Sequence, residues 1–137
     1  MDSIYSIVHV TTEKYYDKIL KDGYLCPYKA ENGTGVFCFI QKKKDEWKKM
    51  KSLRLWGNLV IELDKNILIE RNDYTIHNAG DALGIKYFGG DVVYSAKDDN
   101  NTKKFNKAIR DLTKLNEIRF KNKISLKKYM INKNNLS

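Results

Sequence analysis

The run GVFCFI at residues 35–40 constrains the fold of this chain more than any other segment. A strand that faces water on one side alternates apolar and polar residues, and this run contains no polar position. Continuous apolar runs of this length are typical of a central strand buried on both faces. We therefore predict such a strand here, with Cys38 inside it as a buried free thiol.

Length and composition are those of one folded domain. The chain has 137 residues, of which 42% are hydrophobic and 12% aromatic, enough to bury a core without disulfides. No apolar run is long enough to span a bilayer and the first residues lack the features of a signal peptide, so we expect a cytoplasmic protein without a membrane partner. Cys26 and Cys38 form no CxxC motif and have no histidine nearby, so neither a disulfide nor a metal site is predicted.

Hydrophobic periodicity predicts a single mixed α+β domain over residues 1–131. Strands are predicted at residues 3–10, 35–40, 58–64, 91–95 and 117–121. Helices are predicted from the N-cap Thr12 to Gly23, at 42–55 and at 103–115. The other segments are predicted as a short strand at 67–69, a loop at 73–80, one helical turn within 81–88, an amphipathic piece at 125–131 and a disordered tail at 132–137.

An excess of lysine gives the chain a formal net charge of +9. Such a charge attracts phosphate, which makes nucleic acid a candidate partner. The arginines are confined to positions 54, 71, 110 and 119, and lysine binds phosphate less specifically than arginine does. The alternative is that a Lys- and Asn-rich composition reflects an AT-rich coding genome. The lysine run at 42–51 is likewise either a solvated helix face or a nucleic-acid contact.

Two short motifs lie near opposite ends of the chain. The first predicted strand ends in His9-Val10-Thr11, a helix follows, and a turn at 23–25 precedes the GVF strand. Near the other end, the segment NEIRFKNKISLKKY at 116–129 places Glu117 at the start of a strand. The first motif resembles the start of the ADP-ribosyltransferase-like fold, and the second resembles the close of DarT-like enzymes, in a His-aromatic-Glu arrangement. The resemblance implies a compact split β-sheet core with flanking helices.

The resemblance also implies an activity. Enzymes of this family bind NAD as a co-substrate, break the bond between nicotinamide and ribose, and transfer ADP-ribose to a nucleic-acid or protein acceptor. Because the transition state resembles an oxocarbenium ion, a fixed carboxylate stabilises it, and the resemblance gives this role to Glu117. The residues that the resemblance assigns to NAD binding are His9, Thr11, Gly23, Leu25, Phe37, Phe39 and Arg119.

Each assigned residue also has a purely structural interpretation. A lone histidine in an apolar strand is commonly a core residue, and Thr11 can simply precede the helix. Glu117 can be a solvated strand end, with Arg119 as its surface ion-pair partner. The two phenylalanines can be core aromatics rather than rings that line a nicotinamide site.

The chain departs from the family in ways that bear on its activity. Residues 26–41 hold only Lys29 as a basic residue, where many DarT-like enzymes carry an arginine, which argues against the DarT subtype and thymidine as target. His77 is followed by Asn78-Ala79, so the two-histidine phosphodiesterase pattern is absent. Two other hypotheses stay open: transfer of an RNA 2′-phosphate to NAD, and a non-catalytic nucleotide-binding or inhibitor module of phage or mobile-element type.

Overall fold

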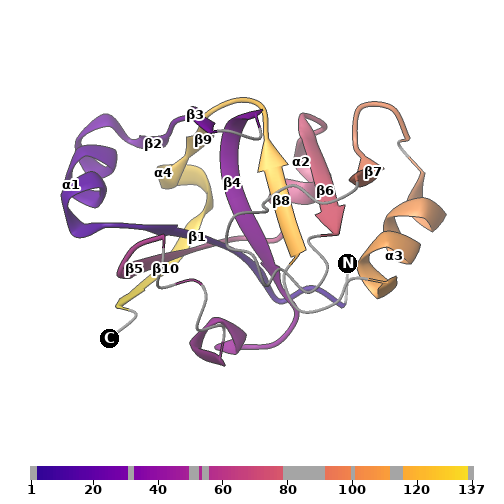
Figure 1. Ribbon diagram of the computed structural model, residues 1–137, viewed down its shortest axis with the longest axis horizontal. Helices are drawn as coiled ribbons and strands as arrows, with labels where there is room; N and C mark the ends of the chain where they lie inside the picture. Colours follow the sequence, from indigo (N-terminus) through magenta and orange to yellow (C-terminus); the bar gives the residue numbers. More distant parts are fainter. Residues whose placement is uncertain are drawn as a thin grey trace.

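Figure 1 shows the computed structural model of the chain, in which residues 3–30, 33–49, 53, 56–78, 92–99, 101–111 and 116–135 are described. The described strands are β1 (Ser6–Thr11), β2 (Tyr24–Leu25), β3 (Tyr28–Ala30), β4 (Gly33–Gln41), β5 (Leu59–Leu63), β6 (Tyr74–Asn78), β7 (Val92–Ser95), β8 (Asn116–Phe120), β9 (Ile124–Ser125) and β10 (Met130–Asn135). The described helices are α1 (Glu13–Asp22), α2 (Ile67–Glu70), α3 (Thr102–Asp111), α4 (Leu126–Tyr129) and the 3-10 helix η1 (Glu46–Lys49). The fold is mixed α+β, as predicted.

The main sheet divides in its middle, between β1 and β4. Its strand order is β10-β5-β1-β4-β8-β6-β7, with β3 beside β4. The pairing of β1 with β4 ends at Val8 and Phe39, although β1 continues along β5 as far as Thr11 and β4 continues along β8 back to Val36. In Figure 1, β1 and β5 run roughly horizontally, whereas β4, β8 and β6 run close to vertically. The two halves of the sheet therefore separate beyond Val8 and Phe39.

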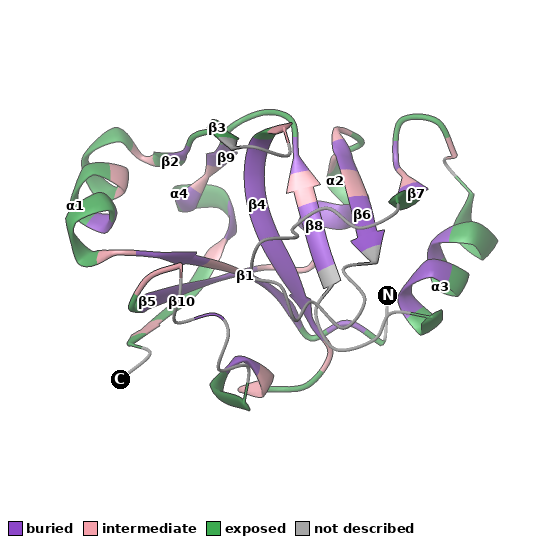
Figure 2. Ribbon diagram, viewed as in Figure 1, coloured by how far each residue is buried: buried purple, intermediate pink, exposed green. Residues whose placement is uncertain are grey.

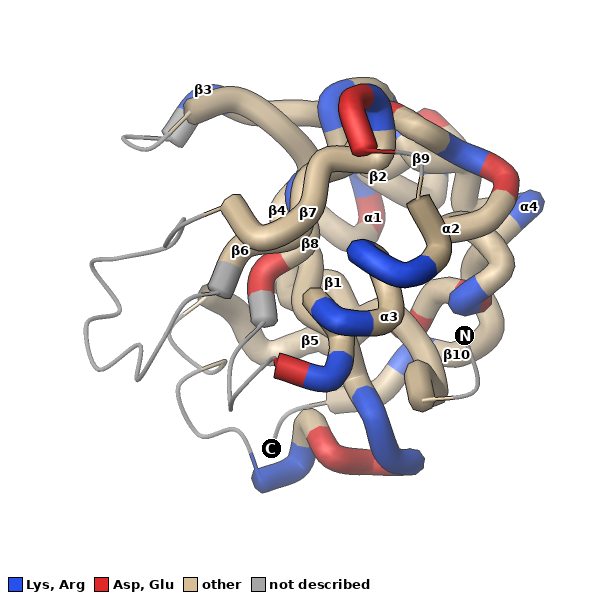
Figure 3. The backbone as a smooth tube through the Cα atoms, turned by 90° about the vertical axis from the view of Figure 1, so that its right-hand side faces the viewer, with Lys and Arg blue, Asp and Glu red and all other residues tan. Residues whose placement is uncertain are grey.

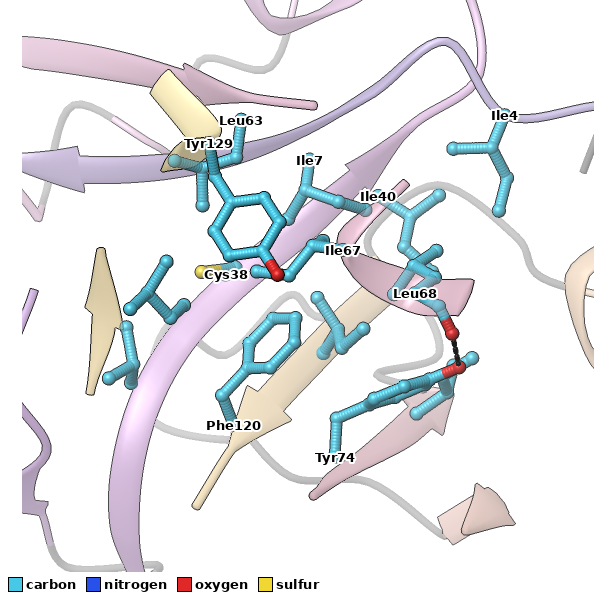
Figure 4. Packing of buried hydrophobic residues seen from close by; sticks show 14 of the residues in the cluster. Ile4, Ile7, Cys38, Ile40, Leu63, Ile67, Leu68, Tyr74, Phe120 and Tyr129 are labelled. Atoms are coloured by element: carbon cyan, nitrogen blue, oxygen red, sulfur yellow. Dashed lines mark hydrogen bonds between the residues drawn. The ribbon is translucent and has the colours of Figure 1, made fainter. Parts of the chain in front are cut away.

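Both faces of β4 are buried, which confirms the central strand predicted from the apolar run. Val36, Cys38 and Ile40 belong to a large core that also contains side chains of α1, α2, α3 and α4. Figure 4 shows this core around Cys38 and Phe120, with the Tyr74 hydroxyl donating to the carbonyl of Leu68. Phe39 belongs to a smaller core on the other face. Figure 2 shows β4 buried along most of its length.

The caps of α1 form as predicted. Thr12 is the N-cap, and its hydroxyl oxygen accepts a hydrogen bond from the backbone N–H of Tyr15 at 3.2 Å. Gly23 ends the helix with φ of 81°, a left-handed conformation, and its N–H donates to the carbonyl of Ile19. Local sequence signals are sufficient here because both caps bond within one helical turn.

The predicted helix at 42–55 is wrong over its described part, where the chain forms the 3-10 helix η1 and a further 3-10 residue at Leu53 instead of an α-helix. Trp47 explains the difference, because two bonds to the sheet fix it. Its backbone N–H donates to Oε1 of Gln41, and its indole Nε1 donates to Oε1 of Glu62. These tertiary bonds override the helical propensity of the lysine-rich sequence. Residues 50–52 and 54–55 of this prediction lie outside the described residues.

Two further local predictions are wrong, and one cannot be compared. Residues 67–69 form part of α2 rather than a strand, and the predicted loop at 73–80 contains β6. Residues 74–78 form a strand because β6 lies between β8 and β7 and is hydrogen-bonded to both. The helical turn predicted within 81–88 lies outside the described residues.

The expected disordered tail is wrong for residues 132–135, which belong to β10. This strand pairs with β5 from Met130 to Asn135. Its side chains are mostly exposed and polar, so hydrophobic patterning gives no sign of it. Backbone hydrogen bonds along a sheet edge do not require apolar side chains, which is why the pattern missed this strand.

Gly57→Ala is expected to lower the free energy of unfolding by about 3 kcal/mol. A Cβ at this position would overlap the backbone carbonyl of Thr11, whose oxygen already accepts from the N–H of Asn58. Gly23→Ala is the control, because there a Cβ meets nothing within 4 Å and only the left-handed backbone is strained, at about 1 kcal/mol. Urea unfolding of both variants measures the difference, and equal losses would contradict the overlap.

Candidate functional site

Glu117 and Arg119 project from the same side of β8. Their cross-strand partners in β4 are Phe39 and Phe37 respectively. Because cross-strand partners share a face, these four side chains lie together, opposite the face of Ile118 that contributes to the large core. We call this side of β4, β8 and β6 the Glu117 face.

Glu117 is fully buried and half of its carboxylate is bonded. Oε1 accepts from Nη2 of Arg119 at 3.0 Å and from Nε at 3.3 Å. Oε2 is buried and has no hydrogen-bond partner among the residues that the structure describes. A buried carboxylate oxygen without a donor is energetically costly, and Oε2 keeps the capacity to accept a further hydrogen bond.

Two glycines make room for the Arg119 side chain. A Cβ at Gly35 would lie 2.7 Å from Cγ of Arg119, and one at Gly33 would lie 2.7 Å from Nη1. The guanidinium carbon lies 4.7 Å from the centre of the Phe37 ring. On the side of β4 that faces Arg119, Gly33 and Gly35 have no side chains and Phe37 presents its ring. The Arg119 side chain lies along the two glycines and the ring.

Tyr28 on β3 borders the same residues. Its ring meets the Phe37 ring at 5.2 Å with an interplanar angle of 62°, and half of Tyr28 is exposed. The pKa of the Tyr28 phenol is raised mainly by burial and to a smaller extent by the charge of Glu117. Tyr28 therefore keeps its proton at neutral pH and presents an aromatic surface beside the carboxylate.

His77, which the sequence placed in a loop and which fits no two-histidine pattern, lies directly across from Glu117. The ladder between β6 and β8 pairs His77 with Glu117 and Thr75 with Arg119. His77 is buried, and its Nε2 lies 2.7 Å from Oγ1 of Thr75. The alternation Tyr74-Thr75-Ile76-His77 is the signal that could have revealed a strand here, with its polar residues on one face.

His9 projects to the other face of the sheet. It pairs with Ile61, whose side chain lies in the large core. Its Nδ1 lies 2.8 Å from the carbonyl oxygen of Phe37, and Sγ of Cys38 lies 3.9 Å from the same nitrogen. Since a carbonyl only accepts, Nδ1 carries the hydrogen. The ring of His9 thus bonds β4 where the backbone ladder between β1 and β4 has ended.

Thr11 lies on the same face as His9 and is buried. The side chains of His9 and Thr11 therefore point away from the face of Glu117. The expectation that these three residues line one site is wrong, because the alternation along three paired strands sends them to opposite faces. The structure brings together Glu117, Arg119, Phe37 and Phe39 of the predicted set.

Gly23 and Leu25 connect the two motifs rather than border Glu117. Leu25 is buried in the large core, and it pairs with Ile124 in the small sheet of β2 and β9. The carbonyl of Gly23 accepts from the N–H of Leu126. The two segments that carry the family resemblance are thus hydrogen-bonded to each other, although their side chains do not form the predicted site.

His9→Asn and His9→Leu are expected to separate the two contributions of His9 to stability. Burial lowers the pKa of His9 below its ordinary value of 6.5, so the unfolded chain takes up this proton at a higher pH than the folded chain does. Wild-type stability therefore falls as the pH drops below 6.5, and both variants lack this component. Asparagine retains a donor near Nδ1, whereas leucine removes the His9 donor from the Phe37 carbonyl, at about 1–3 kcal/mol. Urea unfolding at pH 7.5 and 5.5 tests both effects; equal pH dependence in all three proteins would contradict the assignment.

Glu62 is a second buried carboxylate, and both of its oxygens accept hydrogen bonds from the protein. Oε2 accepts from the hydroxyl of Ser6 at 3.2 Å, and Oε1 accepts from Nε1 of Trp47 at 3.2 Å. Nδ2 of Asn134 reaches Oε1 at 3.5 Å. Both oxygens of Glu62 thus connect sheet, η1 and β10, whereas Oε2 of Glu117 connects nothing among the described residues.

The described residues contain no group of three or more His, Cys, Asp or Glu side chains placed to hold a metal ion. They also contain no helix that is long and apolar enough to cross a membrane. Cys38 is buried as a free thiol, and burial raises its pKa far above the ordinary thiol value. Searches of family models, curated proteins and solved structures find no match to this chain.

Proposed function

We propose that this protein is an NAD-dependent ADP-ribosyltransferase in which Glu117 is the catalytic carboxylate. The buried and unpartnered Oε2 of Glu117 carries the proposal. In this function Oε2 accepts a hydrogen bond from a ribose hydroxyl, and the negative charge stabilises the ribosyl cation as the bond to nicotinamide breaks. Arg119 orients the carboxylate by donating to Oε1.

The aromatic residues near Glu117 suit the nicotinamide ring of NAD. Nicotinamide is a flat ring, and the half-exposed ring of Tyr28 beside Phe37 offers a surface on which it can stack. The opposite orientation of His9 and Thr11 removes the side-chain contacts to NAD that the family resemblance assigned to them. In the proposed function these residues shape the division between β1 and β4, and the residues of the Glu117 face bind the reacting end of NAD.

The acceptor in this proposal is a nucleic acid or a protein, and the net charge of +9 favours the former. Figure 3 shows Lys and Arg residues spread over α3, α4 and the segment around η1. Some of these charges are neutralised locally, since Lys104 and Lys107 form ion pairs with Asp99 and Asp111. Charge alone therefore gives general attraction to phosphate rather than a recognition surface.

Incubation with NAD labelled in its adenylate phosphate, together with nucleic acid and a protein lysate, tests the proposal. We expect nicotinamide release and transfer of label, and digestion of the products with nuclease or protease identifies the class of acceptor. A folded protein that neither releases nicotinamide nor transfers label would refute the transferase. NAD binding without release would instead favour the nucleotide-binding module.

A further inference from the structure

The residues of β6 complete an array of four polar side chains, which are Glu117, Arg119, His77 and Thr75. His77 lies opposite Glu117, and Thr75 lies opposite Arg119. Cross-strand neighbours on one face have Cβ atoms about 5 Å apart, so each pair is in contact range. The proposed role of Glu117 involves the two residues on β8 and assigns no function to His77 and Thr75 on β6.

The ring of His77 is held in place. It is buried, with only 6% of its surface exposed, and Nε2 lies 2.7 Å from the Thr75 hydroxyl. A buried histidine with a fixed ring next to a carboxylate is a common arrangement for proton transfer.

The transfer reaction requires a group that takes up a proton. The acceptor X–H forms a bond from X to C1′ of the ribose, while the bond from C1′ to nicotinamide breaks and its electron pair returns to the pyridinium ring. Nicotinamide leaves neutral, and the proton of X–H remains to be removed. Glu117 is bound to Arg119 and supplies negative charge to the ribosyl cation, so a second group suits the proton better.

The described titratable side chains of the Glu117 face leave one candidate. An arginine side chain such as Arg119 only donates hydrogen bonds and takes up no further proton. Tyr28 keeps its proton, because burial and then the charge of Glu117 raise the pKa of its phenol. His77 remains, and its place in the ladder puts it beside the carboxylate.

We propose that His77 is the general base that takes the proton from the acceptor as ADP-ribose is transferred. This inference rests on the proposed transferase function. Thr75 is a positioning residue in it, since its hydroxyl fixes the orientation of the imidazole. Glu117 and His77 then divide the chemistry, the first stabilising positive charge on the ribose and the second removing the proton.

Chemical rescue tests this role. His77→Gly is expected to lower the turnover of NAD about 100- to 10,000-fold with little change in the KM for NAD. Added imidazole, which fits the space left by the ring, should restore part of the rate. Pyrrole has the same ring size but is not basic, so it should restore none. His77→Gln, which retains volume and a bond to Thr75, guards against loss of folding and should show the same loss without rescue.

Four results would overturn the inference: full activity of either His77 variant, equal rescue by pyrrole and imidazole, no rescue by imidazole of a folded glycine variant, or a loss that appears only in the KM for NAD. Failure of the proposed function looks different. A wild-type protein that releases no nicotinamide refutes the transferase and the base together, whereas activity that depends on Glu117 but not on His77 refutes the base alone.

Discussion

Replacing Glu117 with glutamine is expected to lower the rate of nicotinamide release about 100- to 1,000-fold. Glutamine retains the shape of the side chain and an oxygen that accepts from Arg119, which bonds only Oε1. It lacks the negative charge that the developing ribosyl cation requires. Chromatographic measurement of nicotinamide, with NAD varied, separates the expected loss of kcat from a change in KM.

Glu62→Gln is the matched control for this variant. Glu62 is also buried, yet its two oxygens accept bonds from Ser6 and Trp47, so its role is structural. We expect a loss of about 1–3 kcal/mol in the free energy of unfolding and an unchanged rate per folded molecule. A wild-type rate for Glu117→Gln, or an equal kinetic loss in Glu62→Gln, would exclude a specific catalytic role for Glu117.

Gly35→Ala is also expected to have a large effect, because it displaces Arg119 from Glu117. The added Cβ would lie 2.7 Å from Cγ of Arg119 and 2.9 Å from the carbonyl oxygen of Phe120. The side chain must move away, and Oε1 of Glu117 then loses its donors. We expect a loss of about 1–3 kcal/mol in unfolding free energy and a large fall in nicotinamide release. Urea unfolding and the NAD assay measure the two effects.

A double-mutant cycle attributes the effect of Gly35→Ala to Arg119. In an Arg119→Ala background the added methyl no longer meets the arginine, so its kinetic cost should largely disappear. Thr34→Ala, at an exposed neighbouring position in β4, should change stability by less than about 0.5 kcal/mol. Additive effects of Gly35→Ala and Arg119→Ala would mean that the glycine acts only through the backbone of Phe120.

Where the determinants are local, the sequence alone predicted the structure. The caps Thr12 and Gly23 bond within one turn of α1, and the periodic apolar residues of α3 need only one face to pack. The apolar run of β4 predicted burial on both faces, which the two cores confirm. The pairing of Glu117 with Arg119 was one of the interpretations that their spacing of two residues on one strand allowed. That interpretation placed the ion pair at the surface, whereas the carboxylate is buried.

Long-range pairing decided the rest. The strands β6 and β10 exist because neighbouring strands complete their backbone hydrogen bonds. The side chains of β10 carry little hydrophobic signal, and the alternation in β6 covers only four residues. The register of β1, β4 and β8 placed His9 on the face opposite Glu117, and the register of β6 placed His77 beside it. Side chains in a strand alternate with a period of two, so shifting the register by one residue exchanges the two faces. The sequence thus determined which residues could carry the chemistry, and the tertiary structure decided which of them meet.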